Sequence, residues 1–194
     1  QLVLNFQPKI RIDDGSLSGV EALVRWHHPE LGEISPGRFI PLAEETGLIL
    51  DIGQWVVRSA CRQLGNWDEH GFVTNVAINI SGTEFLHGDP AGVVRQETEA
   101  TGIDPSRLQI EITESVLVSD SAEVRAGLTA LRQLGCGIAL DDFGTGYSSL
   151  AYLKRFPPDT LKIDRVFVRN VHDDPGDAAI VEAILSLSQS LQLT

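Results

Sequence analysis

The chain has 194 residues, of which 42% are hydrophobic and 22% are charged, with 18 Gly and 9 Pro. This length and composition are typical of one globular domain and exclude disordered, collagen-like and coiled-coil proteins. The 15 Lys and Arg residues are outnumbered by 27 Asp and Glu residues, giving a net charge of −12. Such an acidic chain repels phosphate backbones, so non-specific binding to nucleic-acid polymers is not expected.

The sequence also gives an expectation of where in the cell the domain is located. No apolar run approaches the roughly 18 residues that span a bilayer, and no secretory leader opens the chain. Cys61 and Cys136 are isolated in the sequence, which is typical of a reducing compartment, and we expect both in the core. We therefore expect a cytoplasmic domain without membrane contact. Because the chain starts at Gln1 and contains no Met, we interpret it as a piece excised from a longer protein.

The first third of the chain predicts a hairpin and two helices. Apolar residues alternate on both sides of the turn Asp13–Ser16, which indicates a β-hairpin. Ser35 followed by Pro predicts a helix start, and Gly47 predicts its end. The apolar residues from Ile52 to Trp67 recur at three-to-four spacing, as in an amphipathic helix.

Strands and helices then alternate to the end of the chain. The predicted strands are Val76–Ser81, Leu108–Thr113, Ile138–Asp141 and Leu161–Asp164. The predicted helices start at Asp89, at Asp120 with Glu123 as a capping box, and at Asp174 with the apolar stripe Ile180, Ile184, Leu187 and Leu191. This alternation indicates parallel βα units, in either an open doubly wound sheet or a closed barrel.

The two faces of the strands favour the barrel. One face of five strands is aliphatic, whereas the other carries polar residues, namely Glu21, Arg25, Asn79, Glu111, Asp141 and Lys162. Covering these polar groups with a second helix layer would be expensive, whereas a barrel gathers them around one axis. The C-terminal mouth of a barrel is also where active-site residues converge.

Five of these positions form an all-oxygen ligand set: Glu21, Asn79, Glu111, Asp141 and Asp142. Such a set favours Mg²⁺ or Mn²⁺ over zinc. The adjacent Asp141 and Asp142 would repel each other without a cation, and a carboxylate that bridges two ions relieves this repulsion. The alternative is that single members cap loops or form ion pairs.

Two cationic side chains share the polar face. Lys162, two residues before Asp164, could orient a water molecule or stabilise charge on a phosphoryl group, or it could form a buried pair with an aspartate. Arg25 offers a fork suited to phosphate, or an interior ion pair with a carboxylate. The glycine-containing segment Gly144–Ser149 lacks the lysine of a phosphate-binding P-loop.

Six sequence blocks form a recognisable series: Phe6–Lys9, Glu21–Trp26, Asn79–Ser81, Glu111–Glu114, Asp141–Leu150 and Leu161–Asp164. Within the second block, Glu21-Ala22-Leu23 matches the signature for which the EAL domain family of bacterial cyclic di-GMP phosphodiesterases is named. The chain resembles this family over nearly its whole length.

The resemblance implies a TIM-like (β/α) barrel with an antiparallel first strand, and hydrolysis of cyclic di-GMP to linear pGpG with two Mg²⁺ or Mn²⁺ ions. It assigns one metal to Glu21, Asn79, Glu111 and Asp141, and the second metal to Asp142 beside a shared Asp141. It implies catalytic roles for Glu21 and Lys162, with Lys162 helping to position and activate the attacking water.

The resemblance also implies functions around this centre. Gln7, Arg25 and Asp164 would bind substrate, and Glu114 would hold the loop from Asp142 to Leu150 in a metal-competent shape. That loop communicates with the partner in a homodimer in the family, and companion signalling domains are expected in the full-length protein.

One departure from the family pattern concerns the end of the chain. The family continues with a seventh strand that carries a metal-site glutamate and an eighth strand near the substrate, whereas this sequence stops at Thr194. We therefore expect residues 1–194 to be a C-terminally incomplete EAL domain, truncated before its last two strands and inactive alone. The alternative function is a catalytically silent cyclic di-GMP receptor.

Overall fold

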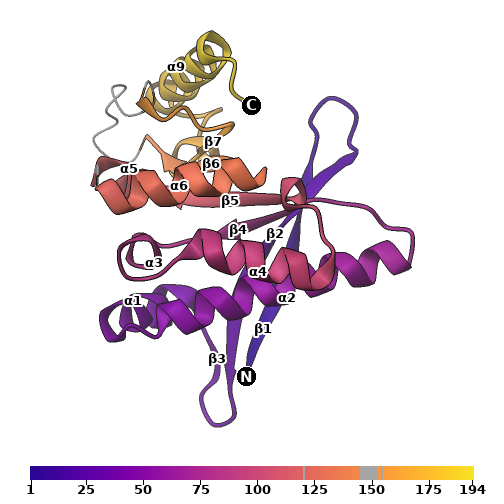
Figure 1. Ribbon diagram of the computed structural model, residues 1–194. Coiled ribbons are helices and arrows are strands. Elements are labelled where there is room, and N and C mark those ends of the chain that lie inside the picture. Colours follow the sequence, from indigo (N-terminus) through magenta and orange to yellow (C-terminus); the bar gives the residue numbers. More distant parts are fainter. Residues whose placement is uncertain (120, 145–152, 154) are drawn as a thin grey trace.

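The structure is a computed structural model, and it describes residues 1–119, 121–144, 153 and 155–194 (Figure 1). Seven strands of these residues form one sheet. The strands are β1 (Leu2–Ile10), β2 (Leu17–His28), β3 (Gly32–Ile34), β4 (Val76–Asn79), β5 (Leu108–Thr113), β6 (Gly137–Phe143) and β7 (Thr160–Ile163). The helices are α1 (Pro36–Thr46), α2 (Ile49–Glu69), α3 (Gly82–His87), α4 (Pro90–Thr101), the 3-10 helix η1 (Pro105–Arg107), α5 (Glu114–Val118), α6 (Ala122–Leu134), α8 (Arg165–Arg169) and α9 (Pro175–Leu191).

The predicted hairpin is confirmed. β1 and β2 pair antiparallel over their length, with Gln7 opposite Glu21. In the connecting turn, the backbone N–H of Ser16 donates to Oδ1 of Asp14 at 2.9 Å. Gly15 lies in the left-handed region with a φ of 71°, which a residue without a Cβ adopts at no steric cost.

The strand order distinguishes the two sheet types left open by the sequence. The order is β1-β2-β4-β5-β6-β7, and every pair from β2 onward in this path is parallel. Each new strand is therefore added on the same side of the previous one, as in a barrel, whereas a doubly wound sheet reverses direction. The TIM-like architecture with an antiparallel first strand is thus as predicted, and in the described part of the chain the sheet remains open between β1 and β7.

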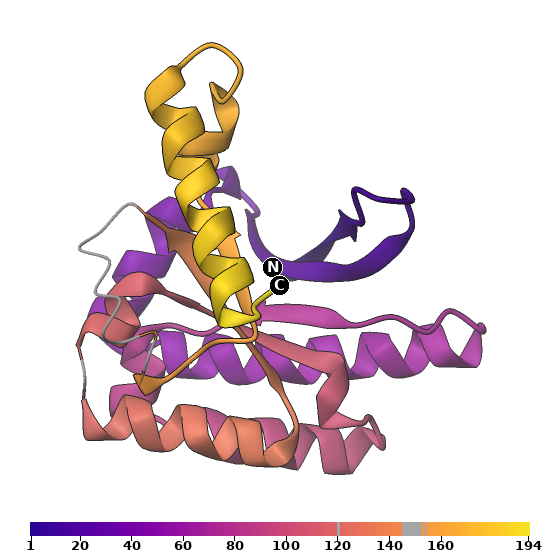
Figure 2. The ribbon, with the colours of Figure 1, turned by 90° about the horizontal axis from the view of Figure 1, so that it is seen from above.

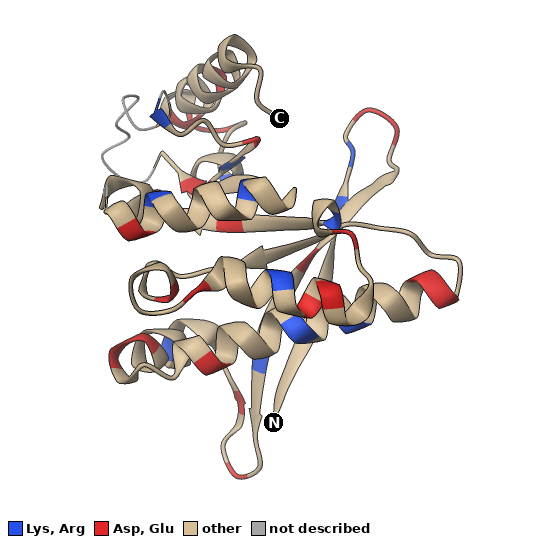
Figure 3. Ribbon diagram, viewed as in Figure 1, with Lys and Arg blue, Asp and Glu red and all other residues tan. Residues whose placement is uncertain are grey.

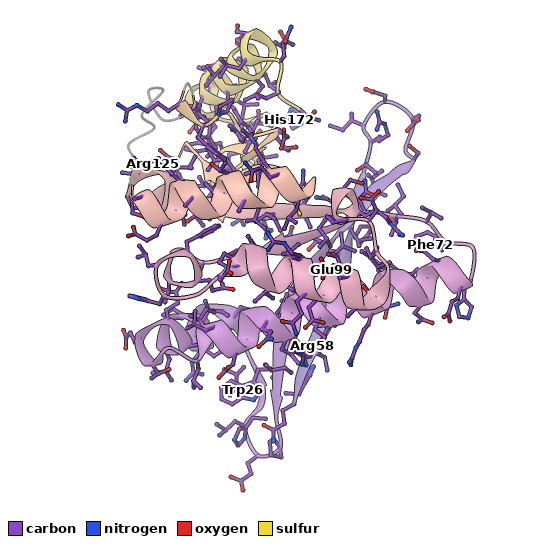
Figure 4. The ribbon with its side chains drawn as sticks, in the orientation of Figure 1. Trp26, Arg58, Phe72, Glu99, Arg125 and His172 are labelled. Atoms are coloured by element: carbon purple, nitrogen blue, oxygen red, sulfur yellow. The ribbon has the colours of Figure 1, made fainter. Side chains whose placement is uncertain are left out.

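Helices α2, α4 and α6 lie side by side along one face of the sheet (Figures 1 and 2). Between them and the sheet lies the core, whose largest fully buried residues include Leu64, Ile110 and Leu128, and which also buries Cys61 and Cys136 as predicted. Arg58 of α2, which is labelled in Figure 4, donates to the buried Glu97 of α4 at 2.9 Å and so links the two helices. Among the described residues, no helix combines the length and apolar character that a membrane span requires.

The residues that the structure describes form no such helix layer on the opposite face of the sheet, which we call the polar face. α9 stands apart from the row of α2, α4 and α6 (Figure 2). Its predicted apolar stripe packs only in part, because Ile184 is buried whereas Ile180 and Leu191 are 39% and 38% exposed. The spacing of the stripe predicts which side of α9 faces the rest of the domain, but it does not predict how much of that side is buried.

Several predicted boundaries shift because polar residues at strand ends cap short helices. β4 ends at Asn79, and Ser81 caps α3 with its hydroxyl accepting from the backbone of Glu84. β7 ends at Ile163, because Asp164 caps α8 and accepts from the backbone N–H of Val166 at 2.6 Å. The cap of α6 is Ser121, one residue after the predicted Asp120, which lies outside the described residues.

Glu84 of α3 is an unusual glutamate, because its ionisable side chain is buried in the domain, with only 8% of the residue exposed. Its Oε2 accepts the backbone N–H of Ser81 at 2.8 Å, completing a capping box. A Cβ on Gly53 would lie 1.8 Å from Oε1 of Glu84, so glycine in α2 is what allows this approach. Burial, with a smaller effect of the charge on Glu44, raises the pKa of Glu84 from 4.5 to about 7.

We predict that Glu84→Gln stabilises the domain above about pH 7. A carboxyl whose pKa is raised on folding binds more protons in the folded state, so its contribution to stability is lost as the pH rises from 4.5 to about 7. Glutamine keeps the capping acceptor without the charge, and we expect a gain of roughly 1 to 3 kcal/mol in the free energy of unfolding at about pH 8, with little gain near pH 5.

Denaturant titrations of both proteins across this range measure the effect. Glu123→Gln, in the exposed first turn of α6, is the matched control and should show no such pH dependence. A constant difference between Glu84→Gln and the parent protein across the range would contradict the assignment.

Candidate metal and active site

Three carboxylates converge on the polar face from three neighbouring parts of the sheet. Glu21 of β2, Glu111 of β5 and Asp141 of β6 each offer one carboxylate oxygen, and these oxygens all lie within 4.8 Å of one another. We call these three residues the carboxylate cluster. The side chain of Glu111 is fully buried, whereas those of Glu21 and Asp141 are 18% and 20% exposed.

Lys162 of β7 lies in the middle of the carboxylate cluster. Its Nζ is 2.5 Å from Oε2 of Glu111, 2.8 Å from Oδ2 of Asp141 and 3.3 Å from Oε2 of Glu21. The Lys–Asp pair that the sequence left open is thus present, with Asp141 as the partner, and Lys162 contacts the two glutamates of the cluster as well. Lys162 alone does not balance the three carboxylates, and even with Lys9, which lies 3.5 Å from Glu111, negative charge remains in excess in a largely enclosed site.

The electrostatics of the cluster follow from this arrangement. Burial raises the pKa of the Glu111 carboxyl above its ordinary value, and the attraction of Lys162 offsets this only in part. Burial also acts to raise the pKa of Glu21, but the hydrogen bond from Asn79 and the charge of Lys162 outweigh it and lower that pKa. For Lys162, burial acts to lower the pKa, but Glu111 and Asp141 raise it above the ordinary range.

Asn79 of β4 completes the group of predicted ligands on this side. Its amide Nδ2 donates to Oε1 of Glu21 at 3.0 Å, which orients its side chain toward the cluster. Figure 3 shows that acidic and basic residues are also spread over the helices, so charge alone does not mark a site. The site is marked instead by the convergence of the Asn79 amide, the three clustered carboxylates and the Lys162 ammonium.

Asp142 lies next to the cluster rather than in it. It is a non-glycine residue with a positive φ of 54°, and its backbone N–H donates to Oδ1 of Asp141 at 2.9 Å. Burial, then the charge of Asp141 and a side-chain hydrogen bond with Asp164, raise its pKa. Asp142 and Asp164 thus form a second acidic pair beside Asp141, where the sequence predicted a second metal.

Gln7 and Arg25, to which the resemblance assigns substrate binding, lie on the polar face, and this role stays a prediction. Gln7 is exposed and directly opposite Glu21 in the β1–β2 register. Arg25 donates to the carbonyl oxygen of Val24, and its Nε lies 3.9 Å from Oε1 of Glu33 in β3. Glu33 is exposed, so Arg25 does not form an interior ion pair with it, and Arg25 also lines the cavity described next.

A cavity of about 570 Å³ opens beside the carboxylate cluster. Its sheet wall includes Arg25, Asn79 and Glu111, and its other walls come from α1, α2 and α3. Its volume is within the range of pockets that hold small-molecule ligands.

Glu114, at the start of α5, is 7% exposed. Neither of its carboxylate oxygens has a hydrogen-bond partner among the described residues. Residues 145–150 of the loop that it was predicted to hold, Asp142 to Leu150, lie outside the described residues, so this role stays a prediction.

A polar layer that the sequence analysis did not identify lies next to the cluster. Lys9 of β1 donates to Oε1 of Gln109 at 2.6 Å, and Gln109 donates to the hydroxyl of Thr160 at 3.0 Å. Strand parity was the available signal, since Lys9 is on the same face as Gln7, and Gln109 on the same face as Glu111.

The comparisons with known proteins concern the chain as a whole. The family model for the EAL domain matches residues 1–194. The bifunctional diguanylate cyclase/cyclic di-GMP phosphodiesterase MucR of Pseudomonas aeruginosa is 48% identical over 194 residues, which are 100% of this chain and 28% of that protein. The chain therefore spans less than a third of the length of this relative.

Two solved structures extend the comparison. The PaMucR phosphodiesterase in its c-di-GMP complex has a TM-score of 0.93 and 48% identity, covering 100% of this chain and 78% of that one. The manganese/cy-diGMP complex of Klebsiella pneumoniae BlrP1 has a TM-score of 0.84 and 28% identity, covering 100% of this chain and 48% of that one. With the whole sequence matched and the fold shared, the chain belongs to the EAL domain family.

Proposed function

We propose that this domain is a phosphodiesterase that hydrolyses cyclic di-GMP to linear pGpG with two Mg²⁺ or Mn²⁺ ions. The observation that carries the proposal is the carboxylate cluster beside Asn79 and Lys162, in a chain of the EAL domain family. The names of MucR and of the solved complexes, which specify a cyclic di-GMP phosphodiesterase and bound c-di-GMP, support the choice of substrate.

The donor set fits a hard divalent cation. Every candidate ligand is an oxygen, and the three clustered oxygens are close enough to share one ion. The buried Glu111 carboxylate makes a cation at this place especially favourable, because an excess of buried negative charge is costly. When bound, such ions neutralise phosphate charge and lower the pKa of water.

The residues of the chain would act around one phosphodiester. In the reaction the oxygen of water bonds to phosphorus, the bond from phosphorus to one ribose oxygen breaks, and that oxygen takes up a proton. Lys162 would donate hydrogen bonds to the water and stabilise the charge that develops on the phosphoryl oxygens. Glu21, as ligand and catalytic residue, would keep its charge, and Arg25, Gln7 and Asp164 would bind the nucleotide.

The net charge of −12 does not oppose this function. The substrate is a dianion, and bound dications invert the local potential of an acidic site. All the metal ligands predicted within this chain are present, so a silent receptor would have to lose activity for another reason.

We also propose that the full protein contains companion signalling domains and functions as a homodimer, and that this domain lies in the cytoplasm, whether or not the full protein is anchored to a membrane. The share of MucR that this chain covers supports the companion domains. The location of the domain rests on its isolated cysteines, and the homodimer rests on the family resemblance.

The function is tested with the full-length protein and purified cyclic di-GMP. We expect conversion to pGpG in Mn²⁺ or Mg²⁺, loss of turnover on metal removal with EDTA, and recovery when either ion is added back. Chromatography of the nucleotides measures the products. Tight nucleotide binding without turnover at any metal concentration would favour the receptor function instead.

A further inference from the structure

A second ammonium reaches the carboxylate cluster from β1. Nζ of Lys9 donates to Oε1 of Gln109 at 2.6 Å and lies 3.5 Å from Oε1 of Glu111. The other oxygen of Glu111, Oε2, contacts Lys162 at 2.5 Å. Each oxygen of this carboxylate therefore faces a different lysine.

The position of Lys9 is itself fixed by neighbouring strands. Gln109 uses its amide Nε2 to donate to Oγ1 of Thr160 at 3.0 Å, which directs its Oε1 toward Lys9. A chain of polar contacts thus runs from β7 through β5 to β1. Gln109 and Glu111 are two residues apart on the same face of β5, so one ammonium can contact both.

Glu111 depends on such partners because its side chain is fully buried. A carboxylate oxygen that is buried without a donor loses its solvation and gains nothing in return. Among the described residues, Lys9 is the side chain in contact with Oε1 of Glu111. Without it, that oxygen would turn toward another donor, and Oε2 would turn with it.

We propose that Lys9 is a positioning residue for the metal site. It holds Oε1 of Glu111, so that Oε2, which shares the ammonium of Lys162 with Glu21 and Asp141, is available as a ligand. Partners that orient a ligand in this way affect metal affinity and activity without touching the ion. The inference rests on the proposed function, since it assigns a role at the same site.

Two possible roles of Lys9, as a positive charge or as a residue that orients Glu111, predict opposite changes in metal affinity when Lys9 is removed. If Lys9 were only a nearby positive charge, its removal would strengthen the binding of a cation. If it orients Glu111, its removal weakens that binding. The direction of the change in Mn²⁺ affinity therefore separates the two.

The test compares Lys9→Met with Lys9→Arg in the full-length protein, using Mn²⁺ alone as the probe in titration calorimetry. We expect Lys9→Met to weaken Mn²⁺ binding about tenfold or more and to lower kcat to a similar extent, with the KM for cyclic di-GMP changed less than about twofold. Lys9→Arg, which keeps the charge and the donors, should recover most of both. Arg11→Met, in the exposed turn after β1, removes the same charge and should change neither.

Unchanged or tighter Mn²⁺ binding by Lys9→Met would overturn the inference. If Lys9→Met fails to fold, as judged by its thermal transition, Gln109→Leu is used instead, because that change removes the oxygen that fixes Lys9. The same weakening of Mn²⁺ binding is then expected, and its absence would overturn the inference. The calorimetry needs no turnover, so a parent protein that binds Mn²⁺ without hydrolysing cyclic di-GMP would contradict only the proposed function. A parent protein that binds no Mn²⁺ would overturn both.

Discussion

Asp141→Asn in the full-length protein is expected to lower the turnover of cyclic di-GMP by at least about a hundredfold, the scale of one lost electrostatic catalytic group. Asp141 contributes one of the three clustered carboxylate oxygens and contacts Lys162 at 2.8 Å. Asparagine has the same shape, and its amide oxygen can still accept the backbone N–H of Asp142. The change therefore removes a charge and a metal ligand while it preserves the local backbone.

The measurement is the initial rate of pGpG formation over a range of Mn²⁺ concentrations. Asp13→Asn, in the exposed turn after β1, is the matched control, because it removes the same charge at the end of the hairpin remote from the cluster. We expect the control to retain the parent rate. A near-normal rate for Asp141→Asn, at any Mn²⁺ concentration, would show that Asp141 is not a shared ligand.

Much of the fold could be predicted because each parallel strand alternates between an aliphatic and a polar face. In β5, Ile110 and Ile112 are buried against the helices, whereas Glu111 and Gln109 lie on the polar face. A strand alternates with a period of two, so one correctly placed polar residue fixes the face of the whole strand. This is why Glu21, Glu111, Asp141 and Lys162 could be expected in one place without a structure.

The short helices α3, α5 and α8 could not be predicted in the same way. Five or six residues are too few to show a helical stripe. The polar residues that precede them extend the apparent strand pattern, as Ser81 does after β4 and Asp164 after β7. The capping hydrogen bonds that mark the starts of α3 and α8 become visible only in the structure.

The contacts between polar residues of different strands could not be predicted from the sequence either. Parity places Lys9 on the polar face, but it does not give the register between β1 and β5, which are not neighbours in the sheet. The contact of Lys9 with Gln109 and Glu111 arises from strand tilt and stagger, which bring the sides of a barrel-like sheet together. A sequence pattern contains no information on such a distance.

Lys162→Ala is expected to separate chemistry from binding. Lys162 contacts all three clustered carboxylates, so its loss leaves three negative charges facing one another in a poorly solvated site. In the absence of divalent ions we therefore expect a lower thermal transition for the variant than for the parent protein. With Mn²⁺ added, the ions supply the missing positive charge, and the transition should return close to that of the parent.

Turnover, by contrast, should not return with the metal. If Lys162 acts on the water and on the developing phosphoryl charge, its loss affects the transition state and not the bound nucleotide. We expect Lys162→Ala to bind cyclic di-GMP measurably by calorimetry, while its rate of hydrolysis in saturating Mn²⁺ falls by at least about a hundredfold. If the affinity for the nucleotide collapses in parallel with the rate, Lys162 is a binding or structural residue. If stability and rate both recover in Mn²⁺, its charge serves only to neutralise the carboxylates until a cation takes its place.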